Sequence, residues 1–388
     1  MRSAARRRRR LVDTIRRAGA ITDPAWADAF RQVPRHVFVP RFFLPDADGW
    51  AAMGHSDPGW LATVYSDRVL VTQLDDDPGM WHAARRTGPV RGVPTSSSSM
   101  PSIMAIMLEE LFVAGGDRVL EVGTGTGYNA ALLCHRLGSA NVSTVDIDGR
   151  LVRKARARLA TSGYRPACEA WDGARGYAPN APYDRILCTC SVSSIPMAWL
   201  EQTAPGGLVV TTLHRPIGAG LVRIVVGHGA VGFGRVLPRD GRFMPLRAHR
   251  FADTQRLLAA ISVNGSRPRE THLPIRAVLN PSSRFEFFAG LALPQVVPTF
   301  DADSPATTYL LHPDGSWARH ESGDGSGLVT QGGPRPLWDL LEAAYADWRA
   351  LGEPTRERFG VTVSPARQCF WLDEPDSERS WELTQSAT

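Results

Sequence analysis

The sequence is poor in cysteine and lysine and has no long apolar runs. Its 388 residues include five cysteines and no Cys-x-x-Cys pair, which excludes a disulfide framework and argues against a zinc site. No apolar stretch approaches the roughly 20 residues that a membrane-spanning helix needs. The Arg-rich N-terminus is not followed by the apolar segment of a secretory signal. We therefore expect a soluble, cytoplasmic protein with reduced cysteines, no membrane partner and no metal.

Positive charge comes almost entirely from arginine. Lysine and arginine number 44 against 39 acidic residues, a net charge of +5, and Lys154 is the only lysine. A dense cluster, Arg6 to Arg10, lies near the start of the chain. An acidic partner such as a nucleic acid would explain this cluster, but a solvated first helix is the simpler interpretation. Composition therefore gives no reason to expect a nucleic-acid partner.

The middle of the chain alternates between strand and helix patterns. Strands are predicted at residues 118–122, 141–147, 167–171, 183–190 and 208–213. Helices are predicted at residues 101–111, 128–137, 149–162 and 195–203, and a hairpin at 221–226 and 230–237. This alternation predicts an α/β fold, a doubly wound, Rossmann-like parallel sheet.

The two ends of the chain have weaker patterns. Helices are predicted at 3–17 and 24–30, an extended segment at 33–40, and a long irregular connection at 44–95 with one strand at 68–73. After residue 248 we expect an additional C-terminal α+β domain, with strands near 284–288, 308–312 and 359–363 and a helix at 337–351. The predicted division is 1–105 for N-terminal helices and a substrate-side loop region, 106–247 for a cofactor-binding core, and 248–388 for the accessory domain.

A glycine-rich turn follows the first core strand. Glu121 precedes Gly123, Gly125 and Gly127, which are spaced G-x-G-x-G and lead into a helix. Glycine lets a backbone turn sharply and approach a ligand closely. Dinucleotide folds space their glycines G-x-G-x-x-G instead. The earlier third glycine and the preceding acid favour S-adenosylmethionine over a pyrophosphate cofactor.

Acidic residues end the next two strands. Asp146 is placed to accept hydrogen bonds from ribose hydroxyls, in either an NAD or an S-adenosylmethionine site. Asp172, followed by Gly173, is placed to accept from an adenine amino group. Its neighbour Asp148 is predicted to cap a helix. Each acid alone is equally explained as a turn residue, but their order on successive strands indicates a nucleotide site.

Several ordered motifs resemble the protein-L-isoaspartate O-methyltransferase family over roughly residues 10–247. The cofactor signature of that family is matched by Leu120–Ala131, its N-terminal P-R-x-x-F-V-P by Pro34–Pro40, and its A-Y-x-D by Tyr65–Asp67. Further matches are Ala181–Ile186, Ile195-Pro196 with Leu200 and Gln202, Pro205–Gly207 and Phe243–Leu246. The resemblance implies a class I S-adenosylmethionine-dependent methyltransferase, with S-adenosylhomocysteine as product.

The substrate-side signature of the family, Q-T-I-S-x-P, is replaced by a serine run. Alignment on Pro101 places Ser99 on the family's serine and Ser97 on its threonine, whereas Ser96 replaces glutamine and Ser102 replaces histidine. A serine run by itself is typical of a flexible linker. The flanking matches favour a functional hydroxyl at Ser99.

The resemblance implies specific site residues. Catalytic roles fall on Ser99 and Ser97. Cofactor contacts fall on Ser98, Glu121, Gly123, Thr124, Gly125, Gly127, Asp146, Ile147, Asp172 and Gly173. Substrate contacts fall on Asp67, Thr189, Cys190 and Ser191. Cys188 and Cys190 are otherwise expected to be small packed residues.

Three departures from the family suggest a specialised substrate. They are the extra C-terminal residues, the long 49–94 connection with its Asp75–Asp77 run, and the serine run. They resemble the subgroup that methylates an aspartate of ribosomally synthesised peptides in lanthipeptide and graspetide pathways. The partner would be a macrocyclised precursor peptide, and the ester would lead to aspartimide or isoaspartate. General isoaspartyl repair is the alternative. A nucleic-acid methyltransferase is remote, because Cys190–Ser193 stands where an N-P-P-Y motif would be.

Overall fold

Contacts divide the chain into two units, each built from separate stretches of sequence. The computed structural model describes residues 2–261, 267–301, 304, 306–323 and 326–383. The first unit comprises residues 1–190, 196–211 and 225–230, and the second 191–195, 212–224 and 231–388. This division does not follow the three predicted ranges. Part of the predicted core belongs to the second unit because strand β11 (Gly232–Val236) pairs with β17 (Phe359–Val363).

The first unit begins with helices α1 (Arg2–Arg17) and α2 (Pro24–Gln32). The Asp23 side chain accepts a hydrogen bond from the Ala25 amide at 2.7 Å, which caps α2. The predicted extended segment contains instead the short helix α3 (Arg35–Phe38). The 33–40 prediction was wrong over these four residues, because the Arg35 carbonyl accepts from the Val39 amide and closes a helical turn.

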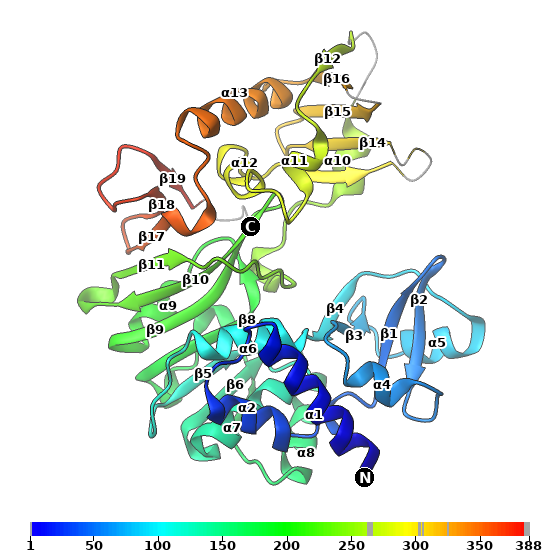
Figure 1. Ribbon diagram of the computed structural model, residues 1–388, viewed down its shortest axis with the longest axis vertical. Helices are drawn as coiled ribbons and strands as arrows, with labels where there is room; N and C mark the ends of the chain where they lie inside the picture. The colour runs from blue at the N-terminus through cyan, green and yellow to red at the C-terminus, as the bar shows by residue number, and fades with distance from the viewer. Residues whose placement is uncertain (1, 262–266, 302–303, 305, 324–325, 384–388) are drawn as a thin grey trace. The chain divides into compact units, whose positions relative to one another are not determined.

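A small antiparallel sheet replaces the predicted irregular connection. Its order is β2-β1-β3-β4, and its strands and helices are β1 (Arg41–Asp46), β2 (Gly49–Gly54), α4 (Trp60–Val64), β3 (Leu70–Leu74), α5 (Met80–Thr87) and β4 (Pro94–Ser98). Figure 1 shows α5 beside this sheet, and it contacts β2 and β3. Phe43, Val71, Leu74 and Ala84 form the buried core of this region. The strand predicted at 68–73 is confirmed as β3. The other strands were not predicted because these apolar residues are brought together only by strand pairing.

The cofactor-binding part of the first unit has a mainly parallel sheet. Its strands lie in the order β9-β8-β5-β6-β7. Their bounds are β5 (Val119–Val122), β6 (Val142–Asp146), β7 (Ala167–Ala170), β8 (Tyr183–Val192) and β9 (Thr203–His214). The helices are α6 (Pro101–Glu109), α7 (Tyr128–Leu137), α8 (Gly149–Thr161) and α9 (Met197–Glu201), with short 3₁₀ turns η1 (Ser139–Asn141), η2 (Gly173–Arg175) and η3 (Ala178–Asn180). The doubly wound α/β prediction is confirmed. Strand β5 pairs in parallel with both β6 and β8, so the strand order reverses beside it. Such a reversal is where ligands bind in this class of fold.

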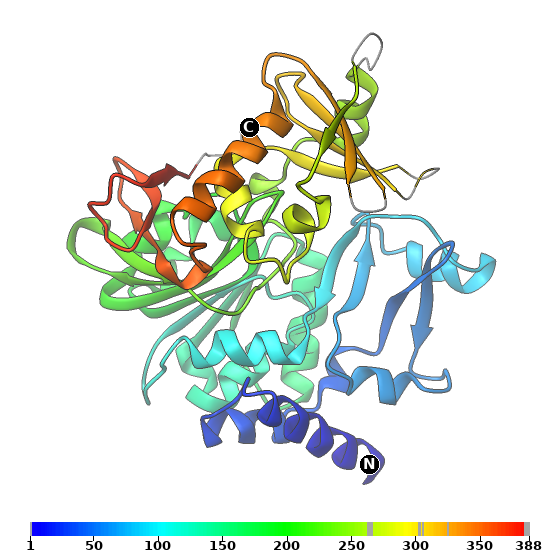
Figure 2. The same ribbon diagram turned by 45° about the horizontal axis from the view of Figure 1, so that its top comes forward.

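The second unit contains two sets of strands. One set has the order β10-β11-β17-β18-β19, and the other is a five-stranded antiparallel sheet of the order β12-β16-β15-β14-β13. Their strands are β10 (Ala219–Val226), β12 (Arg269–Thr271), β13 (Val297–Phe300), β14 (Thr307–Leu311), β15 (Trp317–Ser322), β16 (Gly327–Gly332), β18 (Gln368–Leu372) and β19 (Ser380–Glu382). The helices are α10 (Thr254–Ala260), α11 (Ile275–Leu279), α12 (Glu286–Ala292) and α13 (Leu337–Ala350), with 3₁₀ turns η4 (His228–Ala230), η5 (Arg247–His249) and η6 (Arg356–Arg358). Helix α13 contacts β15 and β16 (Figure 2).

Most C-terminal element predictions were confirmed and one was wrong. The predicted helix at 337–351 and the strands near 308–312 and 359–363 match α13, β14 and β17. The strand predicted at 284–288 is helix α12, where Phe287, Phe288 and Leu291 are all buried. A short apolar run does not distinguish a buried strand from a buried helix. Across the described ranges, no helix combines the length and apolar character needed to cross a membrane.

Candidate active site

The glycine loop after β5 has backbone conformations and close contacts that leave little room for a Cβ. Gly123 has φ of +102°, and a Cβ there would lie 2.7 Å from Thr189 Oγ1. Gly127, with φ of +85°, precedes helix α7, and its Cβ would lie 3.1 Å from that of Ala155. Positive φ is readily accessible only to glycine. The Thr189 hydroxyl donates to the Gly123 carbonyl at 3.0 Å, which ties the loop to strand β8.

A pocket lies between this loop and the serine run. Its empty volume is about 320 Å³, including space open to solvent. The lining consists of Ser97, Ser98, Ser99, Met104, Gly123, Thr124, Gly125, Thr126, Tyr128, Asn129 and Thr189. A Cβ on Gly125 would lie 3.5 Å from the Ser97 carbonyl oxygen. The fold thus brings together the predicted hydroxyl segment and the predicted cofactor loop.

Glu121 lies beneath the loop and does not line the pocket. Its side chain is fully buried. Asn129 Nδ2 donates to one carboxylate oxygen at 2.7 Å, and Thr144 Oγ1 donates to the other at 2.6 Å. Burial raises the pKa of Glu121 to about 7. We correct the predicted cofactor contact: because both oxygens are engaged below the loop, Glu121 supports the loop instead.

Asn129 carries a buried acceptor without a partner. Its Oδ1 has no hydrogen-bond partner among the described residues. The amide faces Glu121 with Nδ2, which is the orientation that suits the ionised form of this carboxylate. Asn129 also lines the pocket. A buried acceptor of this kind fits a ligand with an N–H donor, such as the ammonium of S-adenosylmethionine. Sequence reasoning included Asn129 in a motif but gave it no role.

Asp146 lies at the end of β6, beside the loop. Its carboxylate accepts from the amides of Gly125 at 2.9 Å and Asp148 at 3.0 Å. Each carboxylate oxygen has a second lone pair, so both retain acceptor capacity for hydroxyl groups. The Ile147 side chain is 50% exposed and offers an apolar surface next to this acid. Asp148 caps α8 as predicted, accepting from the Arg150 amide at 2.8 Å.

Asp172 and Gly173 follow β7. The Asp172 carboxylate is exposed and accepts from the Ala174 amide at 3.0 Å. A Cβ on Gly173 would lie 2.3 Å from Val122 Cγ1, so only glycine permits this approach to β5. The turn therefore lies close to the strand that leads into the glycine loop.

The serine run alternates between two environments. Ser96 and Ser98 are buried, whereas Ser97 and Ser99 are partly exposed, as expected when successive side chains in an extended strand point to opposite faces. The Ser98 hydroxyl accepts from Arg35 Nη2 at 3.2 Å. The Ser98 hydroxyl therefore keeps its own hydrogen for a further contact, and Ser98 also lines the pocket. The cofactor contact of Ser98 and the catalytic roles of Ser97 and Ser99 remain predictions.

Arg35 holds the serine run in place through hydrogen bonds to its backbone carbonyls. Its side chain is fully buried and donates to the carbonyl of Ser99 at 3.0 Å and to that of Ser98 at 3.2 Å. It also donates to the carbonyls of Val64 at 2.9 Å and Ser66 at 3.1 Å. Burial lowers its pKa to about 10. Sequence reasoning used Arg35 only as part of a motif, because nothing local indicates that its partners lie about 30 and 60 residues away.

Two predicted substrate residues have structural partners. Asp67 Oδ1 accepts from the Ser102 amide at 2.8 Å and so holds the first turn of α6. Ser191 belongs to the second unit, is fully buried and donates to the Phe243 carbonyl at 2.8 Å. The full burial of Ser191 corrects its predicted substrate contact. A carboxylate with one amide contact can accept further hydrogen bonds, so the predicted substrate contact of Asp67 remains a prediction. Thr189 lines the pocket, and Cys190 lies beside Gly123.

Several known proteins with similar sequences are named protein-L-isoaspartate O-methyltransferase. A sequence model of protein-L-isoaspartate(D-aspartate) O-methyltransferase matches residues 86–238. The protein-L-isoaspartate O-methyltransferase of Methylorubrum extorquens is 34% identical over 56% of this chain and 78% of its own length. That of Methanoculleus marisnigri is 32% identical over 62% of this chain and 91% of its own length. The chain belongs to the protein-L-isoaspartate(D-aspartate) O-methyltransferase family.

Membership of this family establishes the class of enzyme and its cofactor. The chain is a methyltransferase that uses S-adenosylmethionine. A solved structure titled protein-L-isoaspartate O-methyltransferase matches 93% of this chain and 98% of its own with a TM-score of 0.52 at 22% identity. The likeness in fold therefore extends over nearly the whole chain, the C-terminal part included.

Proposed function

We propose that the chain methylates the free carboxylate of isoaspartyl residues in proteins or peptides. The observation that carries this proposal is the pocket in which Ser99 and Ser97 lie opposite the glycine loop. The named activity of the family relatives supports the same substrate. Isoaspartate presents a carboxylate on a short flexible branch, which suits a small pocket lined by hydroxyls.

The glycine loop and its neighbours are the groups that would hold the cofactor. In this proposal Asn129 Oδ1 accepts from the ammonium, and Asp146 accepts from the ribose hydroxyls. Ile147, Asp172 and Gly173 lie at the adenine side, and Thr124, Gly125 and Gly127 shape the loop. When bound, S-adenosylmethionine supplies a methyl group on a positively charged sulfur. The cradle of glycines and the unpartnered Asn129 acceptor fit such a ligand.

In this proposal the protein acts by positioning the substrate carboxylate relative to the methyl group. A substrate carboxylate is ionised at neutral pH because its ordinary pKa is about 4, so no general base is required. We propose that the Ser99 hydroxyl donates to one carboxylate oxygen and thereby directs the other toward the methyl group, with Ser97 beside it. Arg35 holds the Ser98 and Ser99 carbonyls and so fixes the serine run. Such positioning accounts for most of the rate gain in a reaction of this type.

A second, finer candidate is an aspartate in a ribosomally synthesised peptide. The observation that favours it is the departure at Ser96 and Ser102 from the family's glutamine and histidine. Thr189 and Cys190, which lie in β8 beside Gly123, are further candidates for altered substrate contacts. In this case the next backbone nitrogen would attack the ester carbonyl and lose its proton, and the C–OCH3 bond would break to release methanol, which gives an aspartimide. General isoaspartyl methylation has the stronger support, because the relatives found carry that name.

Mass spectrometry with three matched peptides tests the two candidates. The peptides share one sequence and contain aspartate, isoaspartate or aspartate within a macrocycle. A mass gain of one methylene on the isoaspartyl peptide alone supports the first proposal. Gain only on the macrocyclic aspartyl peptide would replace it with the second. The Ser99→Ala variant serves as the control for adventitious labelling.

A further inference from the structure

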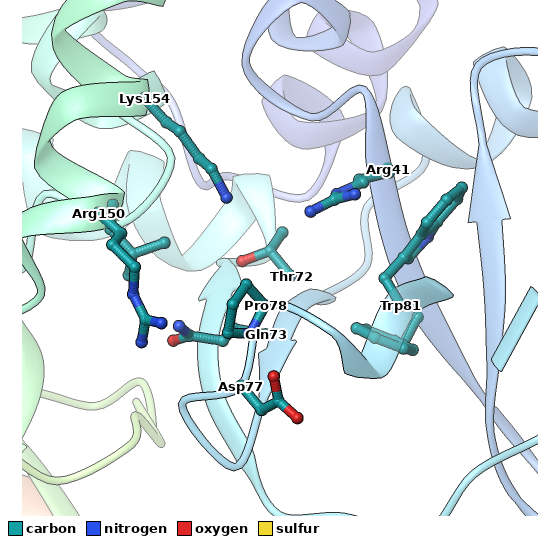
Figure 3. Close-up of a pocket in the computed structure, with 10 residues that line it drawn as sticks. Arg41, Thr72, Gln73, Asp77, Pro78, Trp81, Arg150 and Lys154 are labelled. Atoms are coloured by element: carbon teal, nitrogen blue, oxygen red, sulfur yellow. The ribbon is translucent and has the colours of Figure 1, made fainter. Parts of the chain in front are cut away.

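A second pocket in the first unit is lined by basic side chains from strand β1 and from helix α8. Arg41 comes from β1, Thr72 from β3, and Arg150 and Lys154 from α8. Phe43, Gln73, Asp77, Pro78, Trp81 and Leu151 complete the lining. In Figure 3 the Lys154 ammonium, the Arg41 guanidinium and the Thr72 hydroxyl point toward a common space, and Asp77 lies at the other end. None of these residues was given a role in the methyltransferase site.

The positive charges in this pocket are only partly compensated. Arg150 is engaged: it donates to the Asp76 carbonyl at 2.6 Å and lies 3.5 Å from the Asp148 carboxylate. Arg41 approaches His82 Nε2 at 3.2 Å and lies over the Trp81 ring, 5.0 Å from its centroid. Among the residues the structure describes, no carboxylate lies within 4.0 Å of Arg41 or Lys154.

Neighbouring positive groups add to this imbalance. Arg158 follows Lys154 by one turn of α8, and within the described part of the chain it has no ion-pair partner. Burial and the charge of Arg41 both lower the pKa of Lys154, and the same two causes lower the pKa of Arg158 to about 10. Asp148 opposes this shift at Lys154 but does not reverse it. Like charges held together in partly buried surroundings are costly, and a bound anion removes that cost.

We propose that this pocket, which Thr72 also lines, binds an oxyanion, a phosphate or carboxylate group, through Arg41 and Lys154. Arg41 supplies a planar guanidinium and Lys154 a point charge, a combination suited to an ion with several acceptor oxygens. Trp81 Nε1 is also buried without a hydrogen-bond partner in the described structure, so the wall of the pocket holds a further donor. The oxyanion comes either from free phosphate or from an acidic side chain of the protein substrate.

Two contacts connect the oxyanion pocket to the active site. The Thr72 hydroxyl donates to Ser96 Oγ at 3.1 Å, in the serine run. Gln73 Nε2 donates to Asp148 Oδ2 at 2.9 Å, and the Asp148 amide donates to Asp146. A bound oxyanion would therefore influence the positions of both the serine run and Asp146. A substrate that reached both sites would carry an acidic residue at a short distance from its isoaspartate.

Titration with inorganic phosphate tests the proposal without relying on methyl transfer. Because Lys154 is the only lysine, reductive methylation with ¹³C-formaldehyde gives one side-chain NMR signal besides that of the N-terminus. Lysine methylation keeps the charge. We expect this signal to shift saturably with phosphate and its apparent pKa to rise. Arg41→Gln should weaken phosphate binding at least about tenfold, whereas Arg153→Gln, an exposed arginine on the same helix, should leave it unchanged.

A second arm identifies the source of the oxyanion. Phosphate affinity is also measured by calorimetry for the unlabelled wild type and for Lys154→Gln, with circular dichroism as the check of folding. Michaelis constants are then compared for isoaspartyl peptides with and without a nearby aspartate. A lower KM for the acidic peptide, lost in Lys154→Gln and competed by phosphate, assigns the pocket to substrate. Phosphate binding with equal KM values assigns it to a free oxyanion. No saturable shift of Lys154 and no calorimetric binding in wild type would overturn the proposal, whatever the activity.

Discussion

In each unit, a buried charged group is stabilised in a different way. In the first unit, fully buried Arg35 donates mainly to backbone carbonyls around the active site, and Glu121 is held by neutral Asn129 and Thr144. In the second unit, Glu286 is equally buried, but Arg242 contacts both of its oxygens at 2.6 Å. The first arrangement shapes loops that border a pocket. The second neutralises its own charges.

This difference suggests separate roles for the two interiors. An ion pair between two side chains contributes to a fixed scaffold. A charged side chain that donates hydrogen bonds to backbone carbonyls determines the path of the backbone instead. Arg242 also reaches Asp240 at 2.9 Å, and Asp240 lies 3.2 Å from Arg356. We therefore expect substitutions in the first unit to affect catalysis and stability together, and those in the second to affect stability alone.

The largest effect is expected for Arg35→Met. The substitution leaves several buried carbonyls and the Ser98 hydroxyl without their donor, and we expect a loss of about 3–5 kcal/mol in the free energy of unfolding together with loss of turnover. Denaturant unfolding and methyl-transfer assays measure the two effects. The matched variant Arg242→Met should lower stability but leave kcat near the wild-type value once folded protein is counted. Equal loss of kcat in both variants would remove the distinction between the units.

Ser99→Ala tests the proposed positioning hydroxyl. Loss of one positioned donor costs about 2.7–4 kcal/mol in comparable sites, so kcat should fall at least about a hundredfold. Affinity for S-adenosylhomocysteine, measured by calorimetry, should remain close to wild type. Ser97→Ala is the matched control and should have the smaller effect. Wild-type turnover in Ser99→Ala would transfer the role to another hydroxyl.

Asp146→Ala addresses the cofactor side of the same pocket. Removal of charge-assisted acceptance from ribose hydroxyls should cost about 1.5–3 kcal/mol, at least about tenfold in affinity for S-adenosylhomocysteine. Asp172→Ala gives the comparison for the adenine side. If calorimetry finds the Asp146→Ala affinity unchanged, the assignment of this acid is wrong.

Glu121→Gln should change how stability depends on pH. A carboxyl group whose pKa is about 7 in the folded chain and about 4.5 in the unfolded chain binds more protons when folded. Its contribution is therefore complete below the unfolded value and is lost as the pH rises through the folded value. Relative to the variant, the wild type should lose up to about 2 kcal/mol between roughly pH 5 and pH 8. Parallel unfolding curves over this range would mean that Glu121 titrates normally.

Local sequence signals predicted much of the first unit's parallel sheet. Helix α7 has the predicted bounds, Asp148 caps α8, and the predicted glycine turn is present, with positive φ at Gly123, Gly125 and Gly127. Each of these features depends on a few consecutive residues. Of the sheet β1–β4 only β3 was predicted. The other strands were missed because they are short and interrupted, as by Pro45 in β1, and become stable only through pairing.

The sequence by itself determined the cofactor loop, the acids that follow β6 and β7, and the family, because backbone conformation and strand ends are encoded locally. The tertiary structure alone decided which polar groups remain available. It buried Ser98 against Arg35, placed Glu121 beneath the loop and left Asn129 Oδ1 without a hydrogen-bond partner among the described residues. It also gathered Arg41 and Lys154 into one pocket from residues more than a hundred positions apart. Hydrogen-bond partners and charge neighbours are properties of the folded surroundings, and residue spacing along the chain does not specify them.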